Sequence, residues 1–124
     1  MTMALNPNQQ MSSVRLYRIA HGRTGDKGDR SNISVIADRP EFYEAILAQV
    51  TVDCVRRVFQ HRKPGKISRY ELPRIHALNF VLDDVLDGGV NDALNLDSHG
   101  KGLAGFLLDV EIMVPAALLV AELA

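Results

Sequence analysis

The chain has 124 residues, of which 47% are hydrophobic and 23% are charged, values typical of one soluble globular domain and not of a disordered chain. Its formal net charge of −1 gives no electrostatic reason to expect binding to nucleic acid or to an anionic membrane. The single cysteine, Cys54, excludes an internal disulfide and fits a reducing compartment, so we expect a cytoplasmic protein.

The sequence divides into three segments. Residues 1–13 lack the basic and apolar regions of a secretion signal and are expected to be a disordered leader. Residues 14–114 are expected to form one α+β domain. Residues 115–124 are an apolar tail that is too short to span a bilayer. Because so small a chain offers little for this tail to pack against, we expect it to contact a second subunit of a homo-oligomer.

The first half of the domain predicts two strands followed by two helices. Residues 14–20 and 32–38 are rich in β-branched and apolar side chains and predict strands, with a loop over 21–31 between them. A helix over 39–50 begins with a proline and a glutamate, which suit the first turn. A second helix over 51–61 ends before a Pro-Gly pair.

The second half mixes strands with short helices. Residues 66–72 alternate and predict a strand, and further strands are expected over 92–97 and 108–114, with a short helix or turn over 101–108 between these two. Residues 73–89 predict a helix that ends at a Gly-Gly pair. Its apolar residues recur at helical spacing: Ile75, Leu78, Leu82, Val85 and Leu86. This order favours an α+β sandwich, with an antiparallel or mixed sheet and helices on one face.

The segment "HGRTGDKGDRSN", residues 21–32, is the richest in glycine and charge. Its glycines recur every three residues, at Gly22, Gly25 and Gly28. Its cationic residues outnumber its acidic ones by one: Arg23, Lys27 and Arg30 against Asp26 and Asp29. Glycine permits left-handed backbone and close approach to main-chain N–H groups, so the segment suits a phosphate or carboxylate. It lacks the pattern of a P-loop, a dinucleotide fingerprint or an EF-hand. The alternative is a salt-bridged hairpin turn, although about ten residues is long for one.

The remaining chemically active side chains favour ordinary structural roles. Cys54 shares the apolar stripe of its helix and is expected to be a buried hydrophobe and not a nucleophile. The histidines have no metal-ligand spacing, so we expect no metal and no cofactor. They are His21, His61, His76 and His99.

His76 is the histidine with a second interpretation. On the predicted helix it shares one face with Asn79, beside the apolar stripe. A half-buried structural histidine is the simpler interpretation. If that helix faced the glycine-rich loop, His76 and Asn79 would join His21, Asp26 and Lys27 in one polar pocket. Asp97 and Lys101 would be a further phosphate or carboxylate contact, or simply turn residues.

Three motifs, taken together and in order, resemble one small family. They are "AHGRTGDKGDRSNISVIA" at 20–37, "RYELPRIHALNFVLDDVLDGG" at 69–89 and "LNLDSHGKGLAGFLLDVEI" at 94–112. They are similar to the domain that forms the C-terminal part of the acyclic terpene utilisation protein AtuA and that also occurs as a free-standing protein. The resemblance runs from about residue 15 to 114.

The resemblance implies a ferredoxin-like two-layer α+β sandwich. It also implies association with the catabolism of acyclic terpenoid acids as coenzyme A thioesters, beside a larger AtuA-like partner. The positions that it singles out are Arg23, Gly25, Asp26, Lys27, Gly28, Asp29, Asn32, His76, Asn79, Asp97, Gly100 and Lys101.

Three functions are compatible with the sequence. The leading one is an accessory or ligand-binding subunit whose loop over 22–30 binds an anionic group, either a carboxylate or a coenzyme A phosphate. The residues expected to bind are His21, Arg23, Gly25, Lys27, Gly28, Asp29, Asn32, Asn79, Asp97 and Lys101. The second is a stand-alone lyase or hydratase that uses Asp26, Lys27 or His76 as acid or base. The third is an architectural module that assembles a complex through its sheet edge or its apolar tail.

Overall fold

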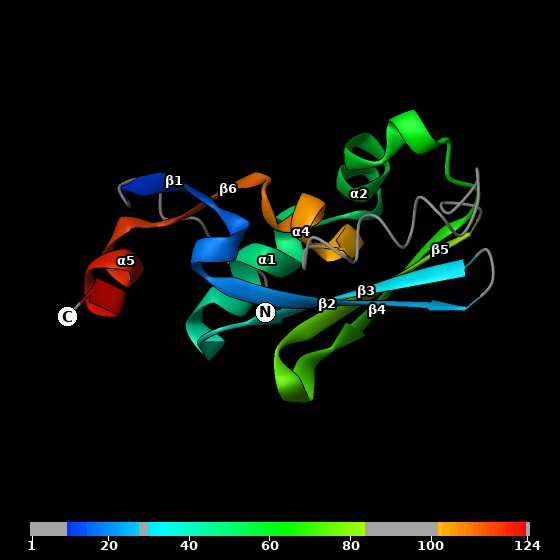
Figure 1. The fold of residues 1–124 in the computed structure, drawn as a ribbon. Coiled ribbons are helices and arrows are strands. Elements are labelled where there is room, and N and C mark those ends of the chain that lie inside the picture. Colours follow the sequence, from blue (N-terminus) through cyan, green and yellow to red (C-terminus); the bar gives the residue numbers. More distant parts are fainter. Residues whose placement is uncertain (1–9, 28–29, 84–101, 124) are drawn as a thin grey trace.

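A four-stranded antiparallel sheet with helices on one face forms the body of the molecule (Figure 1). The structure, a computed structural model, describes residues 10–27, 30–83 and 102–123. The sheet has the order β2-β3-β5-β4, with β2 Ala20–Lys27, β3 Arg30–Ala37, β5 Ala77–Asp83 and β4 Ile67–Leu72. The helices of the described residues are α1 Tyr43–Gln49, α2 Val52–Val58, α4 Gly102–Leu108 and α5 Ala116–Leu123.

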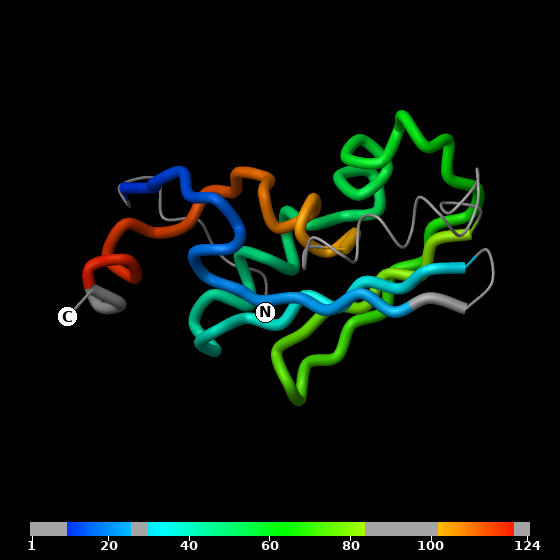
Figure 2. The backbone as a smooth tube through the Cα atoms, in the orientation of Figure 1, coloured from blue at the N-terminus to red at the C-terminus, as the bar shows by residue number. Residues whose placement is uncertain are grey.

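A separate two-stranded sheet joins the two ends of the described chain. It pairs β1, Met11–Arg15, with β6, Glu111–Pro115, in antiparallel register. Figure 2 shows these strands side by side at one end of the molecule, next to α5. Residues 11–13, expected in the leader, therefore belong to a strand. The expected first strand over 14–20 is interrupted by a 3-10 turn, Leu16–Arg18, whose Leu16 amide bonds to the Val110 carbonyl oxygen at 2.8 Å.

The segment expected as a loop over 21–31 is largely strand, and this prediction was wrong. β2 pairs with β3 from Ala20↔Ala37 to Lys27↔Arg30, so only residues 28 and 29 separate the strands. Glycine and charge give this sequence little intrinsic strand preference. Pairing with the apolar strand β3 and packing against α4 override that local preference.

The prediction of a helix over 73–89 was also wrong, because residues 77–83 form strand β5. Leu78, Phe80 and Leu82 are fully buried and alternate with less buried residues, which is the period of a strand. A 3-10 turn, Pro73–Ile75, precedes β5. His76 follows that turn with a left-handed backbone, φ 55°, and is not on a helix.

The other predicted elements are closer to the structure. The helices expected over 39–50 and 51–61 correspond to α1 and α2, and Thr51 caps α2 by accepting a hydrogen bond from the Cys54 amide at 3.2 Å. β6 begins at residue 111 and not at 108, because Leu108 completes α4. The expected apolar tail forms α5. The strand expected over 92–97 lies outside the described residues.

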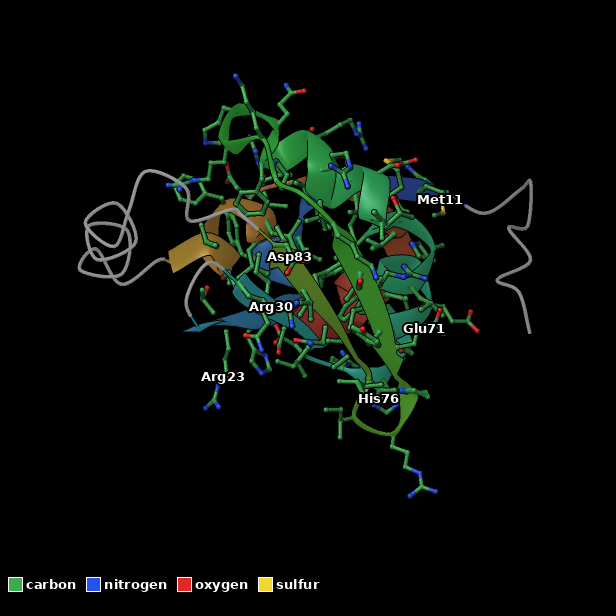
Figure 3. All side chains as sticks on the ribbon, turned by 90° about the vertical axis from the view of Figure 1, so that its right-hand side faces the viewer. Met11, Arg23, Arg30, Glu71, His76 and Asp83 are labelled. Carbon is green, nitrogen blue, oxygen red and sulfur yellow. The ribbon has the colours of Figure 1, made fainter. Side chains whose placement is uncertain are left out.

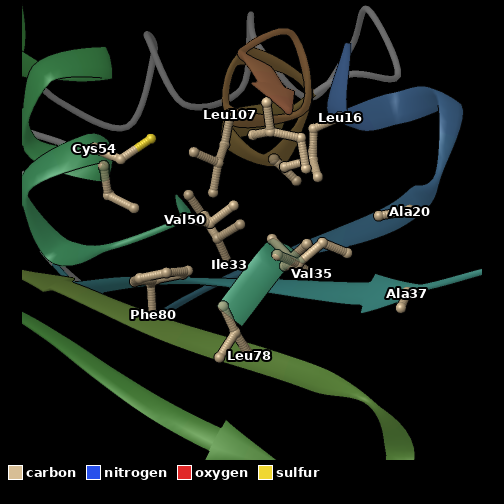
Figure 4. Packing of buried hydrophobic residues seen from close by; sticks show 14 of the residues in the cluster. Leu16, Ala20, Ile33, Val35, Ala37, Val50, Cys54, Leu78, Phe80 and Leu107 are labelled. Atoms are coloured by element: carbon tan, nitrogen blue, oxygen red, sulfur yellow. The ribbon is translucent and has the colours of Figure 1, made fainter. Parts of the chain in front are cut away.

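The hydrophobic core lies between the four-stranded sheet and the helices (Figure 4). Sheet residues such as Ile33, Val35 and Phe80 meet Leu107 of α4 and Val50, which follows α1, in one cluster. Ile33, Val35 and Val50 are all fully buried. Because alternate residues of a strand face opposite sides, the positions between the buried ones project from the other face of the sheet.

Candidate functional site

The face of the four-stranded sheet that lies opposite the helices presents polar side chains near its middle. No described helix covers this face (Figure 1). In β3, Ile33 and Val35 are buried toward the helices, so Asn32, Ser34 and Ile36 project the other way. We call this side the open face.

A row of three polar residues crosses the open face on neighbouring strands. Register places Arg23 of β2 opposite Ser34 of β3, and Ser34 opposite Asn79 of β5. The Ser34 hydroxyl donates to Asn79 Oδ1 at 3.1 Å. Arg23 and Asn79 therefore lie on either side of Ser34, about 10 Å apart at the backbone. We call these three residues, together with Asn32, the polar row.

Arg23 is the cation of this row. Among the described residues the Arg23 guanidinium has no hydrogen-bond or ion-pair partner, and Figure 3 shows its side chain extending away from the sheet. The neighbouring Arg30 differs, because its Nε lies 2.8 Å from Asp83 Oδ1. Unpaired guanidinium donors suit a carboxylate or a phosphate, which they can bind in bidentate fashion.

Asn32 lies two residues before Ser34 in β3, on the same open face, and pairs with Gly25 of β2. A Cβ atom built on Gly25 would come within 2.5 Å of Asn32 Oδ1, so the amide occupies the space that a side chain at position 25 would need. The glycine therefore makes room for Asn32. Neither Gly22 nor Gly25 has a positive φ, so neither uses the left-handed backbone that glycine permits.

The residues of β2 that point toward the helices have structural roles. A Cβ atom on Gly22 would lie 2.9 Å from the Ser34 carbonyl oxygen and 3.3 Å from Ala104 Cβ, so Gly22 lets α4 pack closely on the sheet. The Thr24 hydroxyl accepts a hydrogen bond from the Ala104 amide at 2.8 Å and so satisfies an N–H in the first turn of α4. Part of the glycine-rich motif therefore builds the fold.

The structure does not join His76 to the glycine-rich segment. His76 precedes Ala77, which pairs with Ile36 of β3. Lys27 pairs with Arg30, which lies six residues from Ile36 along β3. At about 3.4 Å per residue, that separation is about 20 Å. The His76 ring instead makes an edge contact with Tyr43, at 5.7 Å between ring centroids.

The other predicted site residues fall into two groups. His21 is exposed on the open face, and its Nδ1 lies 2.9 Å from Asp38 Oδ1. Asp26 and Lys27 belong to β2. Five of the residues singled out from the sequence lie outside the described part of the chain: Gly28, Asp29, Asp97, Gly100 and Lys101.

Sequence reasoning missed Ser34, the residue that connects Arg23 to Asn79. It lies in the apolar segment "NISVIAD", where a serine between isoleucine and valine indicates a strand with one polar face. That alternation was the available signal, and the high apolar content of the segment obscured it.

Cys54 is buried, as predicted, and burial raises the pKa of its thiol. No group of three His, Cys, Asp or Glu side chains within residues 10–27, 30–83 and 102–123 is arranged to hold a metal ion. The helices of the same described ranges are all too short or too polar to cross a bilayer.

Comparison with known proteins identifies the family of the chain. A family model described as the AtuA ferredoxin-like domain matches residues 14–113. Neither curated proteins nor solved structures give a match. The matched span begins in β1 and ends in β6, so it takes in the whole four-stranded sheet and the helices α1, α2 and α4. The antiparallel sheet with helices on one face agrees with the α+β class expected from the sequence, and the chain belongs to the AtuA ferredoxin-like domain family.

Proposed function

We propose that this protein is an accessory, ligand-binding subunit in the catabolism of acyclic terpenoid acids as acyl-CoA thioesters, and that its polar row binds an anionic group of the ligand. The observation that carries the proposal is the exposed Arg23 guanidinium, which has no partner among the side chains that the structure describes, beside the hydrogen-bonded pair Ser34 and Asn79. The Asn79 amide accepts from Ser34, which leaves its N–H groups to donate to an anion.

The exposure of the polar row supports an accessory role. Arg23 and Asn32 are both exposed. An ion pair between exposed groups contributes only about 0–1 kcal/mol, because water screens it. Tight binding would therefore need a second surface that excludes water from the row. We propose that a larger AtuA-like protein provides this surface by covering the open face.

Isothermal titration tests the anion site directly. We expect an acyl-CoA and a simple dicarboxylate to bind the whole chain, and Arg23→Gln to weaken that binding by about five- to tenfold. Arg57→Gln is the matched control, because Arg57 is also exposed but lies on α2, on the helix side of the sheet. Equal binding by the two variants would contradict the proposal.

An architectural module is the second candidate, and one observation favours it. Three large apolar side chains are exposed on the open face or in the turn at its end: Tyr70, which pairs with Asn79, at 53%, Leu72 at 39% and Ile75 at 59%. Such a patch suits contact with another protein. Co-purification with an AtuA-like protein that survives Arg23→Gln but fails in Leu72→Asp would favour assembly over ligand binding.

A stand-alone lyase or hydratase would need an acid and a base close together. The separation of about 20 Å between His76 and Lys27 along the ladder argues against a pair built from these two residues. Turnover of an acyl-CoA by the purified chain alone would revive this alternative.

A further inference from the structure

A groove of about 690 Å³ lies on the helix-covered side of the edge strand β2. Its size falls within the range of small-molecule sites. Two exposed aromatic side chains line it, Tyr17 at 56% and Phe106 at 46% exposure. Both side chains are therefore accessible to solvent and border the same groove.

The base of the groove is formed by small and apolar residues. Gly22 and Ala104 line it together with Leu108. A Cβ atom on Gly22 would lie 3.3 Å from Ala104 Cβ and 3.4 Å from Leu108 Cδ1, so these three residues are in close contact. The small residues Gly22 and Ala104 keep this part of the groove open.

One acidic side chain, Asp109, borders the groove. Its side chain is 68% exposed, and the nearest cation, Arg15 Nη1, lies 3.6 Å from Oδ2, so the carboxylate stays accessible. Arg15 Nη1 makes its shorter contact, 2.7 Å, with the Asp109 carbonyl oxygen. A carboxylate accepts hydrogen bonds and repels an anion, which disfavours a phosphate or fatty acid carboxylate at this position.

We infer that the groove binds the ring of an amino-substituted purine, such as adenine. The aromatic side chains would stack on the base, and the Asp109 carboxylate would accept a hydrogen bond from the exocyclic amino group. Adenine nucleotides and coenzyme A share this base. The inference goes beyond the proposed function, because the groove and the polar row lie on opposite sides of β2.

The two sites are nevertheless close along the chain. Gly22 borders the groove and the next residue, Arg23, projects from the open face. Within the sheet that the described residues form, β2 is an edge strand, so no further described strand separates the two faces at this point. A ligand with both a purine and an anionic group can therefore extend around this edge and contact both sites.

Titration of the whole chain with adenosine tests the groove alone, since adenosine has no anionic group. We expect saturable binding that is weakened about tenfold or more by Phe106→Ala or Tyr17→Ala. Both residues are about half exposed, so the variants should fold, which circular dichroism checks. Tyr70→Ala is the matched control, because Tyr70 is 53% exposed and lies outside the groove.

The hydrogen-bonding partner is tested with inosine, which has an acceptor oxygen in place of the amino group. The wild type should prefer adenosine about tenfold, because the Asp109 carboxylate accepts from the adenine amino group but repels the inosine oxygen at the same position and would have to shift to reach the inosine N1–H. Asp109→Asn should reduce the preference for adenosine over inosine, since an asparagine amide can donate a hydrogen bond to the inosine oxygen. No saturable adenosine binding in the millimolar range, or an unchanged preference in Asp109→Asn, would overturn the inference.

A third arm separates this inference from the proposed function. If both sites act on one ligand, Arg23→Gln should weaken binding of coenzyme A and leave adenosine binding unchanged. Adenosine binding without any effect of Arg23→Gln on coenzyme A would support the groove and contradict the anion site. Loss of adenosine binding in Arg23→Gln would contradict a separate groove.

Discussion

The two glycines of β2 that the structure describes should respond differently to alanine. A Cβ atom at Gly22 would lie 2.9 Å from the backbone oxygen of Ser34, which cannot move without opening the β2–β3 ladder or displacing α4. Overpacking of this kind costs about 1–3 kcal/mol. Gly22→Ala should therefore lower the free energy of unfolding by that amount, and Tm by about 4 °C per kcal/mol.

Gly25→Ala gives a closer nominal contact, 2.5 Å, but the neighbouring atom is the side-chain oxygen of Asn32. An exposed amide can rotate away, and alanine restricts the unfolded chain more than glycine does, so the net change should stay within about 1 kcal/mol. Urea unfolding of both variants measures the difference. If Gly22→Ala proved as mild as Gly25→Ala, close packing of α4 would not be the reason for glycine at position 22.

Three further perturbations test the packing and the assembly. Arg69 Nη1 donates to the carbonyl oxygens of Leu47 and Val50 at 2.8 and 2.9 Å. Arg69→Met should therefore lower the free energy of unfolding, measured by urea titration, by about 2–3 kcal/mol. A mild effect would show that water replaces these hydrogen bonds. Tyr43→Phe removes a 3.1 Å hydrogen bond and should cost about 1 kcal/mol at neutral pH. Burial raises the pKa of Tyr43, so the stability that this shift contributes is fully present below about pH 10 and is lost as the pH rises through the folded-state pKa. Above about pH 10 the free energy of unfolding should therefore fall less for Tyr43→Phe than for the wild type. Val120 is 68% exposed on α5, and we expect it to contact a second subunit of a homo-oligomer. Light scattering should then give a lower molar mass for Val120→Asp than for the wild type. A monomeric wild type would contradict this expectation.

The fold class and the helices α1 and α2 could be predicted from the sequence, because local signals mark them. Pro40 and Thr51 mark the starts of the first two helical segments. Strand β5 was misassigned because its apolar residues satisfy two periods at once. Leu78 and Leu82 fit a helix, and they equally fit a strand in which Phe80 lies between them. Local spacing cannot choose between these, whereas pairing with β3 and β4 does.

The site was harder to predict than the fold because it depends on register between distant strands. Arg23 and Asn79 were both singled out from the sequence, but Ser34, which lies between them, was not. No local pattern indicates that positions 23, 34 and 79 share one row; this follows only from the pairing of three strands. The same pairing separates His76 from Lys27, although a helix at residues 73–89 would have allowed them to meet.

The alternation of β2 divides the motif into two sets of residues with different roles. Gly22 and Thr24 point toward α4 and maintain the fold, whereas Arg23 projects from the open face. Thr24→Val should therefore lower stability by about 1 kcal/mol, because the Ala104 amide loses its acceptor, and should leave anion binding unchanged. Arg23→Gln should weaken anion binding and leave the free energy of unfolding nearly unchanged. Because the two side chains lie on opposite faces and share no partner, their effects on stability should add in the double variant. A coupling energy above about 0.5 kcal/mol would mean that the packing of α4 and the open face are not independent, and that the division of roles along β2 is wrong.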